Sequence, residues 1–118
     1  MEATKPKVEE LDLFLMANLR PKTTGLPMTI WVSERGHARH GPRINKVGLE
    51  HGDKLDPYRT ASVTVSDTPK AVEGELSPQD LRAVQDYIRL NQATLLAYWE
   101  GEIDTAELVA RLNALSDK

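Results

Sequence analysis

Three arginines at four-residue intervals are the residues of this sequence best suited to chemistry with an anion. Arg35, Arg39 and Arg43 have this spacing, with two histidines among them. A guanidinium group is planar and donates two parallel hydrogen bonds, which suits phosphate and carboxylate groups. We therefore predict an anion- or nucleic-acid-binding surface on this stretch. The predicted residues are Arg35, His37, Arg39, His40, Arg43 and Lys46.

Charge is distributed unevenly along the chain. The net charge is -3, but residues 18–47 contain six basic residues and one acid, whereas residues 48–118 contain seven basic residues and thirteen acids. The basic stretch offers one surface to an anionic partner, and the acidic half can compete for it within the chain or across a dimer. A pI near 5.6 favours a protein partner or a homodimer over nucleic acid, since nucleic-acid-binding domains are usually basic.

The histidines raise a second possibility, a metal site. His37 and His40 could supply two imidazole ligands, with His51 or a nearby carboxylate as a third. Residues three apart on a strand face opposite ways, so the pair converges only if Gly36 and Gly41 bend the backbone. The neighbouring arginines also disfavour a dication. We therefore predict no metal and keep His37 and His40 as weak candidates.

Catalytic machinery is not evident in the sequence. Ser33, Thr64 and Ser66 have no identifiable base beside them, and the glycines do not form a nucleotide-binding fingerprint. The chain has no cysteine, which excludes thiol chemistry. We predict no catalytic residue and no cofactor. A small metal-dependent hydrolase using His37 and His40 remains the second alternative.

The basic stretch must be positioned by strands. β-Branched and alternating residues predict strands over residues 28–33, 43–50, 58–65 and 70–73, with loops over 20–27 and 51–57. An apolar stripe predicts a short helix over residues 8–18. The expected fold class is α+β: a small antiparallel sheet of three to four strands packed by a long helix, with a short N-terminal helix and a C-terminal helix.

Strong signals mark the two helices of the second half. Ser77 is a favoured N-cap before Pro78, and Gly101 is a typical C-terminal stop. Asp104 and Glu107 have the spacing of a capping box for the last helix. Apolar stripes give each helix a buried face. The stripes are Leu81, Val84, Ile88, Leu95 and Trp99 on the long helix, and Leu108, Val109, Leu112 and Leu115 on the last. The candidate interface residues are Tyr98, Leu108 and Leu112.

Two segments carry a resemblance to a known family. Val72-Glu73-Gly74-Glu75-Leu76 leads into a helix that ends Leu95-Leu96-Ala97-Tyr98-Trp99-Glu100. This arrangement resembles a family of small bacterial proteins of unknown function, often encoded near toxin–antitoxin-like genes. Such proteins look like a strand region with a histidine pair, an E-G-x-L hairpin and a Leu-x-x-Trp helix. The resemblance covers roughly Leu26 to Glu100 and implies an α+β fold and a partner-linked bacterial role.

Length and composition set the outer limits. A chain of 118 residues fits one domain, predicted at residues 8–118 after a flexible N-terminus at residues 1–7. No apolar run approaches the roughly 18 residues of a membrane span, and the N-terminus does not read as a signal peptide, so we expect no membrane contact and a cytoplasmic location. The predicted function is a binding or interaction module with a protein partner or a homodimer. Nucleic-acid binding through residues 20–46 is the first alternative.

Overall fold

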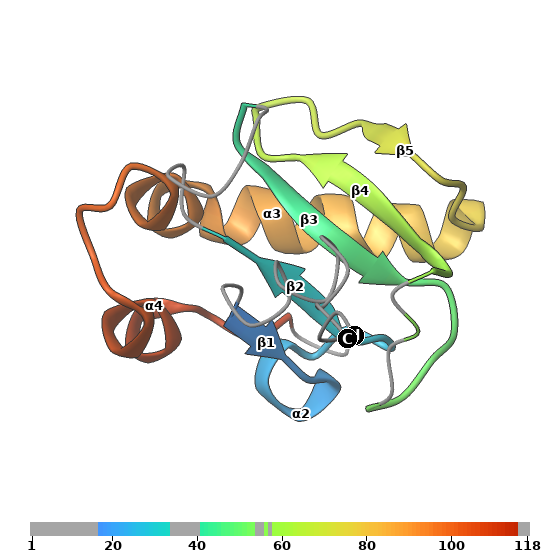
Figure 1. Cartoon of the computed structure of the whole chain (residues 1–118), viewed down its shortest axis with the longest axis horizontal. Helices are drawn as coiled ribbons and strands as arrows, with labels where there is room; N and C mark the ends of the chain where they lie inside the picture. The colour runs from blue at the N-terminus through green and yellow to red at the C-terminus, as the bar shows by residue number, and fades with distance from the viewer. Residues whose placement is uncertain (1–16, 34–40, 54–55, 57, 116–118) are drawn as a thin grey trace, which may run out of the picture.

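The structure is a computed structural model that describes residues 17–33, 41–53, 56 and 58–115. These residues form one antiparallel sheet with α3 across one of its faces, as Figure 1 shows, which confirms the predicted α+β class. The elements are β1 (Ala17–Leu19), α2 (Pro21–Thr24), β2 (Ile30–Val32), β3 (Arg43–Gly48), β4 (Thr60–Thr64), β5 (Ala71–Glu73), α3 (Pro78–Trp99) and α4 (Thr105–Arg111).

The sheet is a five-stranded meander in which the strands lie in sequence order, β1 to β5. It contains one strand more than the predicted maximum, and that strand is β1. Residues 17 and 18 were expected in a helix, and this part of the prediction is wrong. Ala17 and Leu19 are buried whereas Asn18 is exposed, which is the two-residue period of a strand, and β1 pairs with β2. The rest of the predicted helix and the predicted flexible N-terminus lie outside the described residues.

The predicted loop over residues 20–27 contains the single helical turn α2. Pro21 occupies its first position, where a missing backbone N–H costs nothing. Gly25 ends the turn in the left-handed conformation, with a φ of 80°. The loop prediction is therefore corrected by one short helix.

β3 lies at the centre of the sheet and contains an irregularity. Simple alternation would place Ile44 and Val47 on opposite faces, but both are fully buried. The register with β4 shifts between these two residues, so one extra residue is accommodated and both side chains reach the core. Ser62 of β4 donates a hydrogen bond of 2.6 Å to the carbonyl of Asn45 within this bulge.

α3 begins where the sequence predicts. The Ser77 hydroxyl accepts the backbone N–H of Asp80 at 3.1 Å, and Pro78 is the first helical residue. The helix ends at Trp99, and Gly101 follows with a φ of 78°. Of the predicted stripe, Leu81 is half-buried. The buried residues of the stripe are Val84, Ile88, Leu95 and Trp99.

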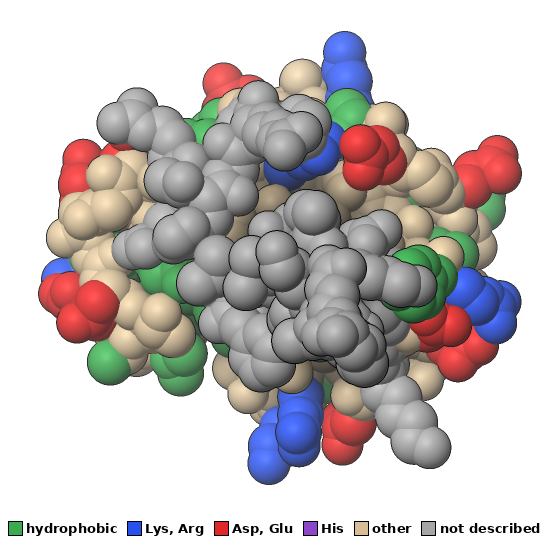
Figure 2. Space-filling view, in the orientation of Figure 1, with side chains coloured by type: hydrophobic (Ala, Val, Ile, Leu, Met, Phe, Trp, Pro, Cys, Tyr) green, Lys and Arg blue, Asp and Glu red, His purple; other side chains and the backbone are tan. Residues whose placement is uncertain are grey.

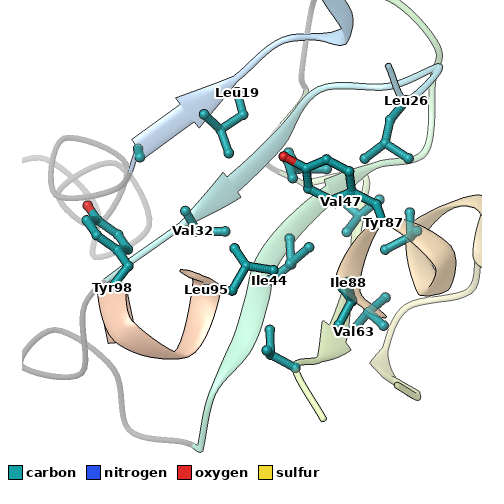
Figure 3. Close-up of a cluster of buried hydrophobic side chains, with 14 of the residues drawn as sticks. Leu19, Leu26, Val32, Ile44, Val47, Val63, Tyr87, Ile88, Leu95 and Tyr98 are labelled. Carbon is teal, nitrogen blue, oxygen red and sulfur yellow. The ribbon is translucent and has the colours of Figure 1, made fainter. Parts of the chain in front are cut away.

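The core fills the space between α3 and the sheet. Figure 3 shows sheet residues such as Ile44 and Val63 beside Ile88 and Leu95 of α3. Tyr87 is fully buried in the same cluster, and its hydroxyl has no hydrogen-bond partner among the described residues. Burial raises the pKa of Tyr87 to about 12.

α4 and the residues after it return across α3. The predicted capping box is confirmed: the Asp104 carboxylate accepts the Glu107 backbone N–H, and the Glu107 side chain accepts the Asp104 N–H. Leu108 is fully buried against the core. Beyond α4, Asn91 of α3 hydrogen-bonds the backbone of residue 113, so the C-terminal segment is anchored to the long helix. Among the described residues, no helix has the length and apolar character needed to cross a bilayer.

Candidate binding site

The structure describes only part of the predicted basic surface. Arg43 and Lys46 lie on β3. Arg20 precedes α2, and Lys22 lies within it; both are exposed. The remaining four predicted residues, Arg35, His37, Arg39 and His40, fall in the segment 34–40, outside the described residues.

The described cations lie along the sheet rather than in one cluster. Leu19, just before Arg20, is aligned with Ile30 and Val47, whereas Arg43 lies four residues away at the other end of β3. Arg20 and Arg43 are thus about five residues apart along the strand direction, or roughly 16 Å at 3.3 Å per residue. In Figure 2, which shows the sheet face away from α3, the visible Lys and Arg side chains form separate groups instead of one patch.

Lys46 belongs to a row that crosses three strands. Asn18 of β1 is aligned with Trp31 of β2, and Trp31 is aligned with Lys46. Ile30 and Val32 are buried in the core, so alternation places Trp31 on the face away from α3. Trp31 is half-buried, and its indole nitrogen is enclosed without a hydrogen-bond partner among the described residues. The row combines an amide, an aromatic ring and a cation on one sheet face.

Arg43 has an unusual environment for a cation. Its side chain is only 11% exposed, and its contact with an acid is a long one, 3.6 Å from Nη2 to Glu73 Oε2. Glu73 is 63% exposed, and the Arg43 Nε is buried with no acceptor among the described residues. A buried charge is costly unless it is paired and hydrogen-bonded, so the guanidinium is incompletely satisfied.

A small polar network surrounds the Arg43–Glu73 pair. The Ser62 hydroxyl lies 3.5 Å from Glu73 Oε1. Asn45 Oδ1 accepts both the backbone N–H and the hydroxyl of Ser33, each at 3.1 Å. These bonds connect the end of β2 to β3, and β4 to β5. They also show what Ser33 does: its proton is already donated to Asn45, so it has a structural hydrogen bond here.

A cavity of about 10 Å³ lies beside Arg43, partly open to solvent. A volume of this size is near the minimum that holds one water molecule. Its walls come from the β2–β3 end of the sheet (Val32, Ser33, Pro42 and Arg43) and from the last turn of α3 (Tyr98 and Trp99). Most of the lining is aliphatic or aromatic, and the cavity lies on the α3 side of the sheet.

The acidic half of the chain forms its own ion pairs. Glu50 pairs with Arg59, and Asp80 with His51. Along the helices, Asp86 pairs with Arg89 and Glu107 with Arg111. Within the described residues, the Arg43–Glu73 contact is the ion pair that joins the basic stretch to the acidic half. Intramolecular competition for the basic stretch is thus confined to one long contact in this part of the chain.

The three helix residues predicted for an interface pack inside this chain and do not lie exposed on its surface. Tyr98 is buried, and its hydroxyl lies 3.0 Å from Thr105 Oγ1. Leu108 is fully buried, and Leu112 packs half-buried against the core. These side chains hold the helices of this chain together. The exposed apolar residues of the same helices are Leu90 and Val109.

The histidines do not converge in the described part of the chain. His37 and His40 lie outside it, and His51 Nε2 lies 3.1 Å from each carboxylate oxygen of Asp80. The described residues contain no group of three or more His, Cys, Asp or Glu that could hold a metal ion.

Sequence reasoning missed the cavity and the partners of Arg43. Glu73 lies on β5, two strands away from Arg43, and its carboxylate is 3.6 Å from the guanidinium. To predict the cavity, one would need to know that the end of α3 lies over the β2–β3 end of the sheet, and no local sequence pattern indicates this. No protein-family model, no curated protein and no solved structure matches this chain.

Proposed function

We propose that this chain is a protein-interaction module that binds an acidic polypeptide segment through the face of its sheet that carries Lys46 and Arg43. The observation that carries the proposal is the state of the described cations. Arg20, Lys22 and Lys46 form no ion pair with a described residue, and Arg43 has one long contact, whereas acids of the other half pair locally. A surface with unpaired cations attracts an anionic partner.

Two features favour an acidic polypeptide over nucleic acid. The described cations are spread over roughly 16 Å of the sheet instead of forming a dense track for successive phosphates. The chain as a whole is acidic, with a pI near 5.6, so its other surfaces repel a polyanion.

Single-stranded nucleic acid is the second candidate, and the row of Asn18, Trp31 and Lys46 is the observation that favours it. A tryptophan beside a lysine on a sheet face can stack on a base while the lysine contacts a phosphate. This reading requires the Trp31 ring to present a free face to the base.

The test is a comparison of ligand classes at two salt concentrations. Isothermal titration calorimetry of the full chain is carried out with a glutamate-rich peptide, its glutamine counterpart and a single-stranded RNA of matched charge, at about 50 and 200 mM salt. We expect the glutamate peptide to bind more tightly than both of the others. If the RNA bound more tightly than the glutamate peptide and its affinity fell steeply at high salt, single-stranded nucleic-acid binding would become the favoured function. If the glutamine peptide bound as tightly as the glutamate peptide, the negative charge of the ligand would play no part in binding.

A further inference from the structure

β5 is the last strand of the sheet, and Figure 1 shows its outer edge without a neighbouring strand in the described part of the chain. All three residues of β5 are exposed, and Val72 in its middle is 48% exposed. An open strand edge can add a further strand through its backbone hydrogen bonds. The β5 edge is therefore a candidate interaction surface, separate from the sheet face that carries Lys46.

The β5 edge is held in place against β4 on both sides of its three residues. Before the strand, the Lys70 N–H donates to Thr64 Oγ1, and the Lys70 carbonyl accepts the Thr64 N–H, both at 2.9 Å. After the strand, Gly74 has a φ of 72°, and a Cβ there would lie 2.4 Å from the Thr60 carbonyl oxygen. Glycine permits this close approach. The edge is thus formed before a partner arrives, which lowers the ordering cost of binding.

The charges along the β5 edge have opposite signs at its two ends. Lys70 precedes the strand, Glu73 is its last residue and Glu75 follows shortly after, and all three are exposed. Neither Lys70 nor Glu75 forms an ion pair with a described residue. Charged residues on an edge strand usually keep it from pairing. An antiparallel copy of the same segment is the exception, because the basic end of each strand then lies beside the acidic end of the other.

We propose that the β5 edge is a homodimer interface, at which residues 70–75 of two copies of this chain pair antiparallel. Lys70 of each copy then lies close to the acidic end of the other, whereas a parallel pairing or an acidic partner strand would bring like charges together. A two-fold axis perpendicular to the sheet relates the two copies, so both use the same surface. The joined sheet has both α3 helices on one face. This inference does not rest on the proposed function.

The interface is short, so the dimer is weak. Stable specific interfaces bury about 1,200 Å² or more, and a pair of three-residue strands covers less than this. Val72 is the apolar side chain that the pairing covers. We therefore expect a monomer at about 10 μM and a measurable fraction of dimer at about 1 mM.

The experiment is analytical ultracentrifugation of the full chain over this concentration range, with ¹⁵N–¹H correlation spectra of the labelled chain at the same concentrations. We expect a monomer–dimer equilibrium and concentration-dependent shifts that are largest at the amides of residues 70–76. Lys70→Glu and Glu75→Lys should each weaken dimerisation about tenfold, since each places like charges side by side. A mixture of the two variants should form a heterodimer, because both pairs between positions 70 and 75 are then opposite in charge.

Two controls separate this pairing from a general effect of charge. Glu75→Lys changes the net charge from -3 to -1, so reduced repulsion between whole chains would strengthen dimerisation instead of weakening it. Arg82→Glu makes the same charge change as Lys70→Glu at an exposed position of α3, and it should alter dimerisation less than twofold. Circular dichroism checks that each variant is folded.

Several results would overturn the inference. A wild-type chain that is monomeric at about 1 mM would do so. Undiminished dimerisation of Lys70→Glu, stronger dimerisation of Glu75→Lys, or a mixture of the two that forms no heterodimer would each do so as well. Concentration-dependent shifts that are largest around the exposed helix residues Leu90 and Val109 would place the contact between copies on the helices and remove it from β5.

Discussion

Asn91 is the residue whose replacement tests most directly how the C-terminal segment is held. Its side chain is buried in the middle of α3, and both ends of its amide bond the backbone of Asn113. Oδ1 accepts the Asn113 N–H at 2.7 Å, and Nδ2 donates to the Asn113 carbonyl at 3.0 Å. Two residues later, the Leu115 N–H donates to the Thr24 carbonyl at 2.7 Å, which connects the segment to α2.

The expected cost of Asn91→Ala follows from these contacts. The two bonds to residue 113 contribute about 1 kcal/mol each. Asn91 has non-helical backbone angles, a φ of -118° and a ψ of 18°, so alanine gains little through helix propensity at this position. Leu112 and Leu115, which pack against the core, lose part of their burial if the segment detaches, at about 1 kcal/mol or more. We expect a net loss of about 3 kcal/mol, which lowers the Tm by roughly 12 °C in a chain of this size.

Urea unfolding followed by circular dichroism measures this loss, and hydrogen exchange at the Leu115 amide shows where it arises. Asn113→Ala is the matched control, because residue 113 contributes its backbone to these bonds and its side chain is exposed. The control should stay within about 0.5 kcal/mol of the wild type. An Asn91→Ala protein as stable as the control, or one with full protection of the Leu115 amide, would refute the reasoning.

Three further changes have defined outcomes. Tyr87→Phe removes a buried hydroxyl without a partner among the described residues, so stability at pH 7 should hold or rise by up to about 1 kcal/mol. Burial raises the pKa of Tyr87 from 10.0 to about 12, so the hydroxyl of the unfolded chain loses its proton at a lower pH than that of the folded chain. The stability of the wild type should therefore fall between pH 10 and 12, and that of Tyr87→Phe should fall less. Identical urea midpoints of the two proteins across this range would contradict this prediction. Gly25→Ala should lower the stability measured in thermal unfolding by about 2 to 4 kcal/mol, since φ is +80° and a Cβ would lie 2.3 Å from the Leu115 carbonyl oxygen. Gly101→Ala is the control: its φ is +78°, but a Cβ would meet open space, so the loss should be about 1 to 2 kcal/mol. Equal losses in the two variants would argue against the close approach of Gly25 to Leu115. Ser77→Ala should cost about 1 kcal/mol in the same assay through the lost cap, and no loss would show that the cap is unimportant.

Local signals in the sequence predicted the helical half well. Ser77 with Pro78, and Asp104 with Glu107, mark helix starts through bonds between residues three apart, so their geometry is set by neighbours along the chain. The apolar stripe of α3 has a period that one buried face imposes. Features of this kind do not depend on how distant segments meet.

The features that were missed depend on tertiary context. β1 is only three residues long, and the sequence before it has a helical pattern of apolar residues, so sequence patterns do not indicate a strand here. The strand forms because the edge of β2 is available for pairing. The bulge in β3 reverses the face of Val47, and simple alternation cannot anticipate an inserted residue. Asn91 interrupts α3 with non-helical backbone angles, and its buried side chain binds the backbone of a residue twenty-two positions further along the chain.

The sequence predicts an anion-binding surface, and the structure gives the positions of only two of its predicted residues, Arg43 and Lys46. Arginines in a basic stretch indicate an anion partner, and in the structure Arg43 contacts Glu73 while its buried Nε has no acceptor among the described residues. The sequence could not show that Arg43 would be nearly buried beside Trp99, or that Arg20 would lie at the far end of the sheet. Both facts arise from strand register and from the direction in which α3 crosses the sheet.

The most direct test of the central claim compares two charge reversals of equal size. Lys46→Glu changes the proposed sheet surface, whereas Arg82→Glu makes the same change in net charge at an exposed position of α3. The measured quantity is the affinity for a glutamate-rich peptide at about 50 mM salt, with folding of both variants checked by circular dichroism. Our account predicts at least a tenfold loss for Lys46→Glu and less than a twofold change for Arg82→Glu. Equal losses in both variants, or no loss in either, would contradict it.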